Sequence, residues 1–74
     1  MTENDIPAFV DAVIAAGADI RSPGEGLYVI GDADMPDPEE RQRLYDIISS
    51  FGPRDHLRHE IATHLRSIGR AYVP

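Results

Sequence analysis

Apolar residues near the start of the chain recur at the period of an α-helix. Five of them share one face at the spacing i, i+3, i+4, i+7 and i+8: Ile6, Phe9, Val10, Val13 and Ile14. This pattern predicts a helix over about residues 5–16. We expect Asp5 to cap its N-terminus and Gly17 to end it in the left-handed backbone conformation.

A β-hairpin is predicted directly after this helix. The turn-forming segment Ser22-Pro23-Gly24-Glu25-Gly26 separates Asp19–Arg21 from the strand-forming segment Leu27–Ile30. Gly31 then breaks the second strand, and an acidic loop follows over residues 31–37.

The alternation of side chains along a strand predicts the two faces of this hairpin. We expect Ile20, Leu27 and Val29 to face the helices. Tyr28 and Ile30 are expected to point the other way, where they would leave apolar side chains on the outer surface.

The second half of the chain carries two more helical patterns. Asp37, Pro38 and Glu40 form a helix start, with an N-cap, a proline at the first position and a glutamate able to close a capping box. The apolar stripe of this helix consists of Leu44, Ile47, Ile48 and Phe51 and ends at Gly52-Pro53. The last helix presents Leu57, Ile61, Leu65 and Ile68 and ends at Gly69.

The segment 71–73 is expected either to add a short third strand or to pack against the domain. The predicted order is therefore α-β-β-α-α. We predict one small α+β domain over residues 1–74, with its helices packed on one face of an antiparallel hairpin.

Charge is distributed unevenly along the chain, whose net charge is −6. Residues 1–40 hold ten acids and one arginine, whereas residues 41–74 hold three acids and six arginines. The negative total argues against direct binding to nucleic acid or to an anionic membrane. The acidic N-terminal segment and the short apolar runs predict neither a signal peptide nor a membrane span, so we expect a cytoplasmic protein. All seven basic residues are arginine, a usage typical of GC-rich bacterial genes.

No feature of the sequence predicts an enzyme. The chain has no cysteine, which excludes disulfides and thiolate metal sites, and it has no nucleophile, phosphate-binding or dinucleotide-binding motif. A chain of 74 residues also leaves little room for a deep pocket beneath a complete core. We therefore expect a binding protein without a cofactor or a metal.

A histidine cluster in the last helix is the alternative metal candidate. His59 and His64 are five positions apart, roughly 140° around a helix, so they do not match the zinc-protease spacing. His56, Glu60 and His64 share one stripe, but the two histidines are roughly 12 Å apart along the helix axis. Metal binding through these three residues remains an alternative function.

The strongest functional signal is a group of five acids at the junction of the acidic loop and the second helix: Asp32, Asp34, Asp37, Glu39 and Glu40. Three of them also stabilise the positive end of that helix. Together the five could engage a basic surface on a larger protein, with Tyr28 or Ile30 as an apolar anchor.

These features favour a non-enzymatic regulator or inhibitor whose partner is a larger protein with a basic surface. Proteins that handle nucleic acid are among the candidate partners. Anti-CRISPR proteins, antiactivators and immunity proteins carried by phages and mobile elements resemble this chain in composition, since many are short, acidic and poor in cysteine. No motif assigns the chain to any of them. Self-association as a homodimer is compatible with this hypothesis.

A second hypothesis is a small DNA-binding transcriptional regulator. The two last helices are joined by a short turn, as in a helix-turn-helix, and the last would be the recognition helix. Four arginines would contact DNA: Arg54, Arg58, Arg66 and Arg70.

Overall fold

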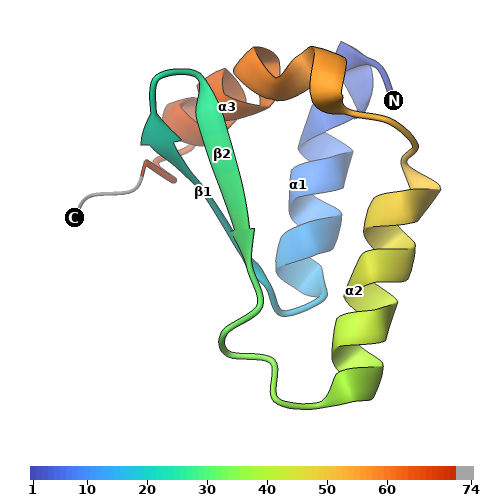
Figure 1. Ribbon diagram of the computed structural model, residues 1–74. Helices are drawn as coiled ribbons and strands as arrows, with labels where there is room; N and C mark the ends of the chain where they lie inside the picture. Colours follow the sequence, from blue (N-terminus) through green and yellow to red (C-terminus); the bar gives the residue numbers. More distant parts are fainter. Residues whose placement is uncertain (72–74) are drawn as a thin grey trace.

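The computed structural model describes residues 1–71 (Figure 1). The elements follow the order η1 (Glu3–Asp5), α1 (Ile6–Ala15), β1 (Asp19–Gly24), β2 (Leu27–Gly31), α2 (Pro38–Ser50), η2 (Asp55–Leu57) and α3 (Arg58–Ser67). The predicted α+β class and the order helix, hairpin, helix, helix are confirmed. The molecule is flat, with principal extents of 31 × 29 × 17 Å.

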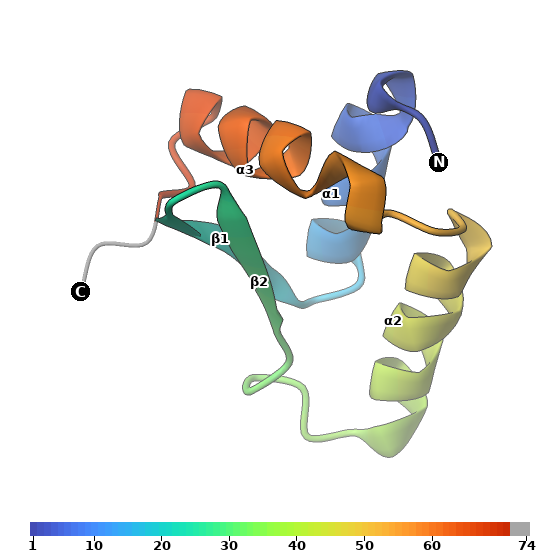
Figure 2. The same cartoon turned by 45° about the horizontal axis from the view of Figure 1, so that its top comes forward.

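The first helix, α1, contacts the hairpin and both of the other α-helices. It packs on β1, α2 and α3, and α3 packs in turn on both strands. Figures 1 and 2 show α1 between the hairpin and α2, with α3 crossing the end of the hairpin where the turn lies. Within residues 1–71, no helix is long and apolar enough to cross a bilayer.

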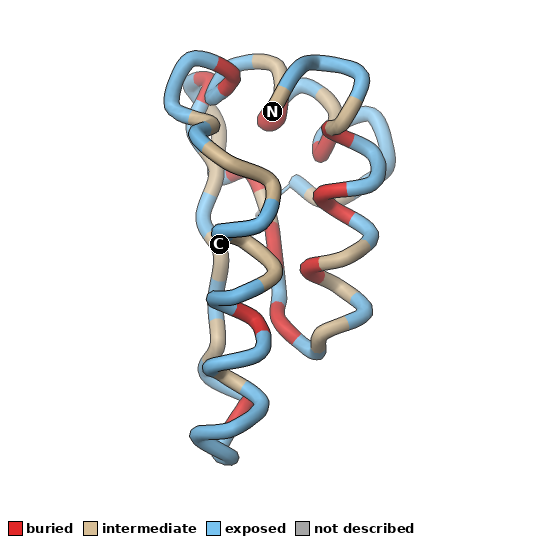
Figure 3. Tube along the Cα trace, turned by 90° about the vertical axis from the view of Figure 1, so that its right-hand side faces the viewer, coloured by how far each residue is buried: buried red, intermediate tan, exposed pale blue. Residues whose placement is uncertain are grey.

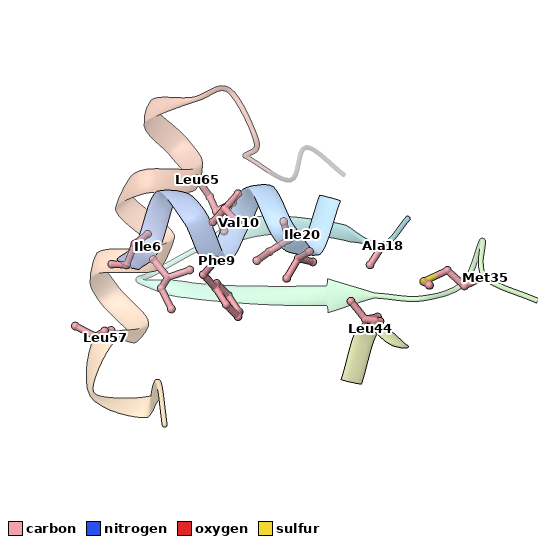
Figure 4. Packing of buried hydrophobic residues seen from close by; sticks show 11 residues of the cluster. Ile6, Phe9, Val10, Ala18, Ile20, Met35, Leu44, Leu57 and Leu65 are labelled. Atoms are coloured by element: carbon pink, nitrogen blue, oxygen red, sulfur yellow. The ribbon is translucent and has the colours of Figure 1, made fainter. Parts of the chain in front are cut away.

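The buried cluster is drawn from α1, β1, α2, η2 and α3 and from the loops that carry Ala18 and Met35. Its residues with no exposed surface are Phe9, Val10, Val13, Ile20, Leu44, Ile61 and Leu65. Figure 4 shows these side chains gathered around α1 and β1, with Leu57 at one end and Met35 and Leu44 at the other. The ring of Phe9 meets that of Phe51 edge to face at 5.4 Å between centroids, which joins α1 to the end of α2.

The predicted ends of α1 are confirmed, but its predicted cap is wrong. Gly17 has a φ of 98° and follows the last turn, as the left-handed residue that ends the helix. Asp5 does occupy the N-cap position, yet its carboxylate caps nothing in α1. It turns back and accepts hydrogen bonds from the Thr2 backbone N–H at 2.8 Å and the Thr2 hydroxyl at 3.2 Å, because η1 precedes the helix.

The hairpin closes through a two-residue turn, Glu25-Gly26. Both residues have positive φ, 57° and 71°, as a type I′ turn requires. Gly26 is also buried under the ring of His59, which lies where a Cβ atom at this position would be. The turn is therefore determined both by backbone conformation and by contact with α3.

The predicted faces of β2 are wrong. A regular register outward from this turn would pair Ile20 with Gly31 and place it on the same face as Leu27 and Val29. A bulge in β1 between Arg21 and Gly24 shifts the register by one residue, so that Ile20 pairs with Ile30. Tyr28 and Ile30 are therefore packed against the core, while Leu27 and Val29 are 43% and 53% exposed on the outer face.

The structure differs from two further predictions near the end of the chain. Ile68 is 47% exposed because α3 ends at Ser67, and Ala62 takes a buried position on the inner face instead. Ala71 forms a single parallel bridge with Ser22, so within residues 1–71 the sheet has two strands. The remainder of the predicted third strand lies outside the described residues.

Burial along α2 is much lower than along α1. Leu44 is its one fully buried residue, whereas α1 buries Ile6, Phe9, Val10 and Val13 over a shorter length. The tube in Figure 3, seen from the side of α2, shows this helix largely as exposed and intermediate segments.

Candidate protein-binding surface

The loop that connects β2 to α2 is anchored at its centre and exposed on either side. Met35 is 2% exposed and belongs to the core, and its backbone N–H donates to the Asp32 carbonyl at 3.0 Å. Asp34 and Asp37 are exposed on the two sides of this anchor. The anchor restricts the loop, so its carboxylates lie on a defined surface.

Two of the five predicted acids are held by hydrogen bonds. The Tyr45 hydroxyl donates to Asp32 Oδ2 at 2.7 Å, and the Glu39 backbone N–H donates to Asp37 Oδ1 at 2.9 Å. The second bond confirms Asp37 as the cap of α2, although Glu40 does not complete a capping box. We call the five acids together the acidic surface: Asp32, Asp34, Asp37, Glu39 and Glu40.

No carboxylate of the acidic surface forms an ion pair within residues 1–71. The ion pairs of that part of the chain both involve Asp19, which binds Arg21 at 2.9 Å and Arg70 at 3.2 Å. Arg41 and Arg43 follow the acids on α2 without pairing to them. The charges of the acidic surface are therefore not compensated by direct contact.

Tyr45 is the aromatic residue of this surface that sequence reasoning missed. Its side chain is 47% exposed beside Asp32. The hydrogen bond to Asp32, together with the negative charge of that carboxylate, raises the pKa of Tyr45 above its ordinary value. The contact joins residues 13 positions apart in different elements, and nothing in the local sequence pattern indicates it.

Tyr28 and Ile30 do not provide the exposed anchor that was expected. Both pack partly against the core, and the Tyr28 hydroxyl accepts a hydrogen bond from Arg54 Nε at 2.6 Å. Tyr45 has the exposed aromatic character that was assigned to them.

A groove separates β2 from α2 next to the acidic surface. Its volume is about 380 Å³, and it is lined by Ile30, Asp32, Leu44, Tyr45, Ile48, Ser49 and Arg54. The apolar lining comes from one strand residue and two helix residues, while Asp32 and Arg54 bring opposite charges. This is the size of a small ligand site.

The four arginines of the DNA-binding hypothesis do not form one free surface. Arg54 is half-buried, with its guanidinium carbon 5.7 Å from the centre of the Phe9 ring and its Nε bonded to Tyr28. Arg70 is bonded to Asp19. Arg58 and Arg66 are exposed on α3, whose inner face packs on the hairpin and α1.

The three residues of the metal hypothesis are divided between two places. His56 lies within hydrogen-bonding distance of the Met1 carbonyl, with its Nε2 at 3.1 Å. Glu60 and His64 line a different depression, which they share with His59 and with Glu3 of η1. No group of three potential ligands in the described part of the chain is arranged to hold a metal ion.

These features define a small α+β domain with an uncompensated acidic surface beside a groove. The chain belongs to the Y4lK family, whose model matches residues 4–73. It is 51% identical over 73 residues to the uncharacterized protein y4lK of Sinorhizobium fredii (strain NBRC 101917 / NGR234), an alignment that covers 95% of this chain and 55% of the relative. The chain thus spans just over half the length of that relative. No solved structure matches it.

Proposed function

We propose that this chain is a non-enzymatic regulator or inhibitor that binds a basic surface of a larger protein through its acidic surface. The observation that carries the proposal is the lack of ion pairs at all five carboxylates within residues 1–71. They lie on the loop anchored by Met35 and on the first turn of α2. A rigid group of uncompensated charges speeds association with an oppositely charged partner and selects against wrong ones. Tyr45 adds an aromatic side chain of the kind that dominates binding interfaces.

The composition of the chain offers a direct test. It contains no lysine, so in a carbodiimide reaction it supplies carboxylates and, apart from the N-terminal amine, no amines. Apart from links through that amine, cross-links to a host protein captured on this chain join its carboxylates to amines of the partner. We expect the linked peptides to contain Asp32, Asp34, Glu39 or Glu40. Linkage concentrated instead at Asp11, Glu25 or Asp55 would overturn the proposal.

Charge reversal gives the quantitative arm of the same test. The double variant Asp34→Arg/Glu39→Arg changes two exposed acids that hold no structural hydrogen bond, and keeps the chain free of lysine. We expect its affinity for the captured partner to fall about a hundredfold, because like charges brought together at an interface cost several kcal/mol. The control Asp11→Arg/Glu25→Arg makes the same change in net charge elsewhere on the surface. An equal loss in both variants would mean that only net charge matters.

A further inference from the structure

One edge of β2 has no hydrogen-bonding partner in the described part of the chain. Backbone groups along an antiparallel strand point alternately toward the two edges. The Leu27 carbonyl points toward β1, because it accepts a hydrogen bond from the Ser22 hydroxyl at 2.7 Å. Val29, two positions further along, pairs with Arg21, and its backbone groups also point toward β1. Tyr28 and Ile30 therefore direct their backbone N–H and C=O groups toward the opposite edge.

The two sides of the hairpin are not equally available to another strand. On the β1 side, the Ser22 N–H already donates to the Arg70 carbonyl at 3.0 Å, and Ala71 bridges to Ser22. The free side of β2 is turned toward α2 (Figure 2). The groove lies between these two elements. No charged residue or proline occurs in Leu27–Gly31 to protect this edge against strand pairing.

The groove beside this edge has an apolar centre and a charge at each end. Ile30, Leu44 and Ile48 supply the apolar part. Asp32 directly follows β2, whereas Arg54 is held near the start of the strand by its bond to Tyr28. The terminal nitrogens of Arg54 have no hydrogen-bonding partner within residues 1–71.

We propose that an extended segment of the partner protein adds to the free edge of β2 in this groove. Its backbone pairs with Tyr28 and Ile30, an apolar side chain covers Ile30 and the inner face of α2, and a lysine or arginine points to Asp32. This inference rests on the proposed function, since Asp32 belongs to the acidic surface. Strand addition obtains affinity from backbone hydrogen bonds and specificity from pockets for alternate side chains.

The charges favour a foreign strand over a second copy of this chain. Pairing two β2 strands edge to edge would bring an uncharged segment, Leu27–Gly31, to the groove, with no cation for Asp32. A partner strand with a basic residue supplies that cation. An acidic side chain about four residues away along the strand would reach Arg54, given a rise of about 3.3 Å per residue.

The probe for the test is a phage-displayed library of short random peptides, selected on the immobilised full chain. We expect the enriched peptides to share a basic residue next to an apolar one. With such a peptide bound, amide hydrogen exchange measured by NMR should slow roughly tenfold or more at Tyr28 and Ile30, and little at Val29, which is already bonded within the hairpin. Failure to enrich any peptide, or slowing at Val29 and Leu27 without Tyr28 and Ile30, overturns the inference.

Asp32→Asn provides the charge test, because an asparagine oxygen still accepts the Tyr45 hydroxyl. We expect it to weaken the selected peptide about tenfold, and the same loss when the peptide's basic residue is replaced by glutamine. Combining both changes should add little further, as required of two groups that contact each other. Asp46→Asn, on α2 but outside the groove, is the matched control. If the losses from the two changes add, the basic residue of the peptide does not contact Asp32, and the proposed charge contact is wrong.

This test and that of the proposed function can fail separately. If charge reversal at Asp34 and Glu39 abolishes partner binding while Tyr28 and Ile30 stay unprotected in the complex, strand addition is wrong and the acidic surface stands. If the two amides are protected but reversal has no effect, strand addition stands and the wider acidic surface is wrong.

Discussion

The two halves of this fold are buried to different extents. In the part formed by α1, the hairpin and α3, side chains from these elements meet and seven apolar residues have no exposed surface. In the part formed by the acidic loop and α2, Met35 and Leu44 are the buried anchors, and the remaining apolar contacts are half-exposed. Both helices α1 and α2 are amphipathic in sequence, so periodicity alone does not predict how deeply a helix is buried.

The difference suggests a division of roles. The closely packed half determines the fold, and the less buried half presents the charged and aromatic side chains. Phe9, Phe51 and Arg54 connect the two halves through an edge-to-face aromatic contact and a cation–π contact. The predictions below test this division, starting with the largest effect.

The same substitution should have unequal effects in the two halves. Ile61→Ala removes a side chain with no exposed surface and is expected to cost about 2–5 kcal/mol of unfolding free energy. That is comparable with the total stability of a domain this small, about 3–5 kcal/mol. Ile48→Ala removes a half-buried side chain and should cost roughly 1 kcal/mol. Urea unfolding followed by circular dichroism measures both. Equal losses would refute the division.

The turn of the hairpin should tolerate no side chain at its second position. Gly26→Ala is expected to cost about 1–2 kcal/mol for the positive φ alone, and more because the His59 ring occupies the space of the new Cβ. Adding His59→Ala should recover the second part of the cost but not the first. A double variant no more stable than Gly26→Ala would show that the ring moves freely, and that the contact between the turn and α3 contributes nothing.

Much of the fold could be predicted from periodicity, because the three helical stripes and their glycine and proline ends are local signals. The register of the hairpin could not. Ser22 and Pro23 introduce one extra residue in β1, and only the burial of Ile20 together with Ile30 reveals which strand carries the bulge. One residue was enough to exchange the inner and outer faces of β2.

The residues around the acidic surface could also be predicted only in part, because some of their contacts are local and others are not. Its five acids are close in sequence and were predicted as a group. The groove depends on pairs that are distant in sequence, Tyr45 with Asp32 and Arg54 with Tyr28, separated by 13 and 26 positions. Such contacts depend on how α2 and η2 are placed against the hairpin, which no short motif encodes. Two of the four arginines, Arg54 and Arg70, are likewise bonded to residues distant in sequence, Tyr28 and Asp19.

The start of α2 should depend on its cap. Asp37→Ala removes the acceptor for the Glu39 N–H and is expected to cost about 1 kcal/mol, with Asp37→Asn close to neutral. Because α2 has few other buried contacts, hydrogen exchange should rise mainly in this helix and much less in α1. A uniform rise in both helices would mean that they unfold as one unit.

The smallest predicted effect is on the titration of Tyr45. Asp32 raises the pKa of Tyr45, so Asp32→Asn should lower the pKa of Tyr45 toward its ordinary value of 10.0. A phenol whose pKa is raised by folding contributes stability below its unfolded pKa and loses it as pH rises through the folded value. NMR titration of the ring signals measures the shift. A pKa that stays unchanged in Asp32→Asn would mean that the hydroxyl is not bound to this carboxylate.

The 17 Å thickness of the molecule limits how it can recognise anything. The groove between β2 and α2 and the depression beside η1 and α3 are both open to the surface. A partner bound in either place would itself have to supply the opposite side of any enclosure that forms.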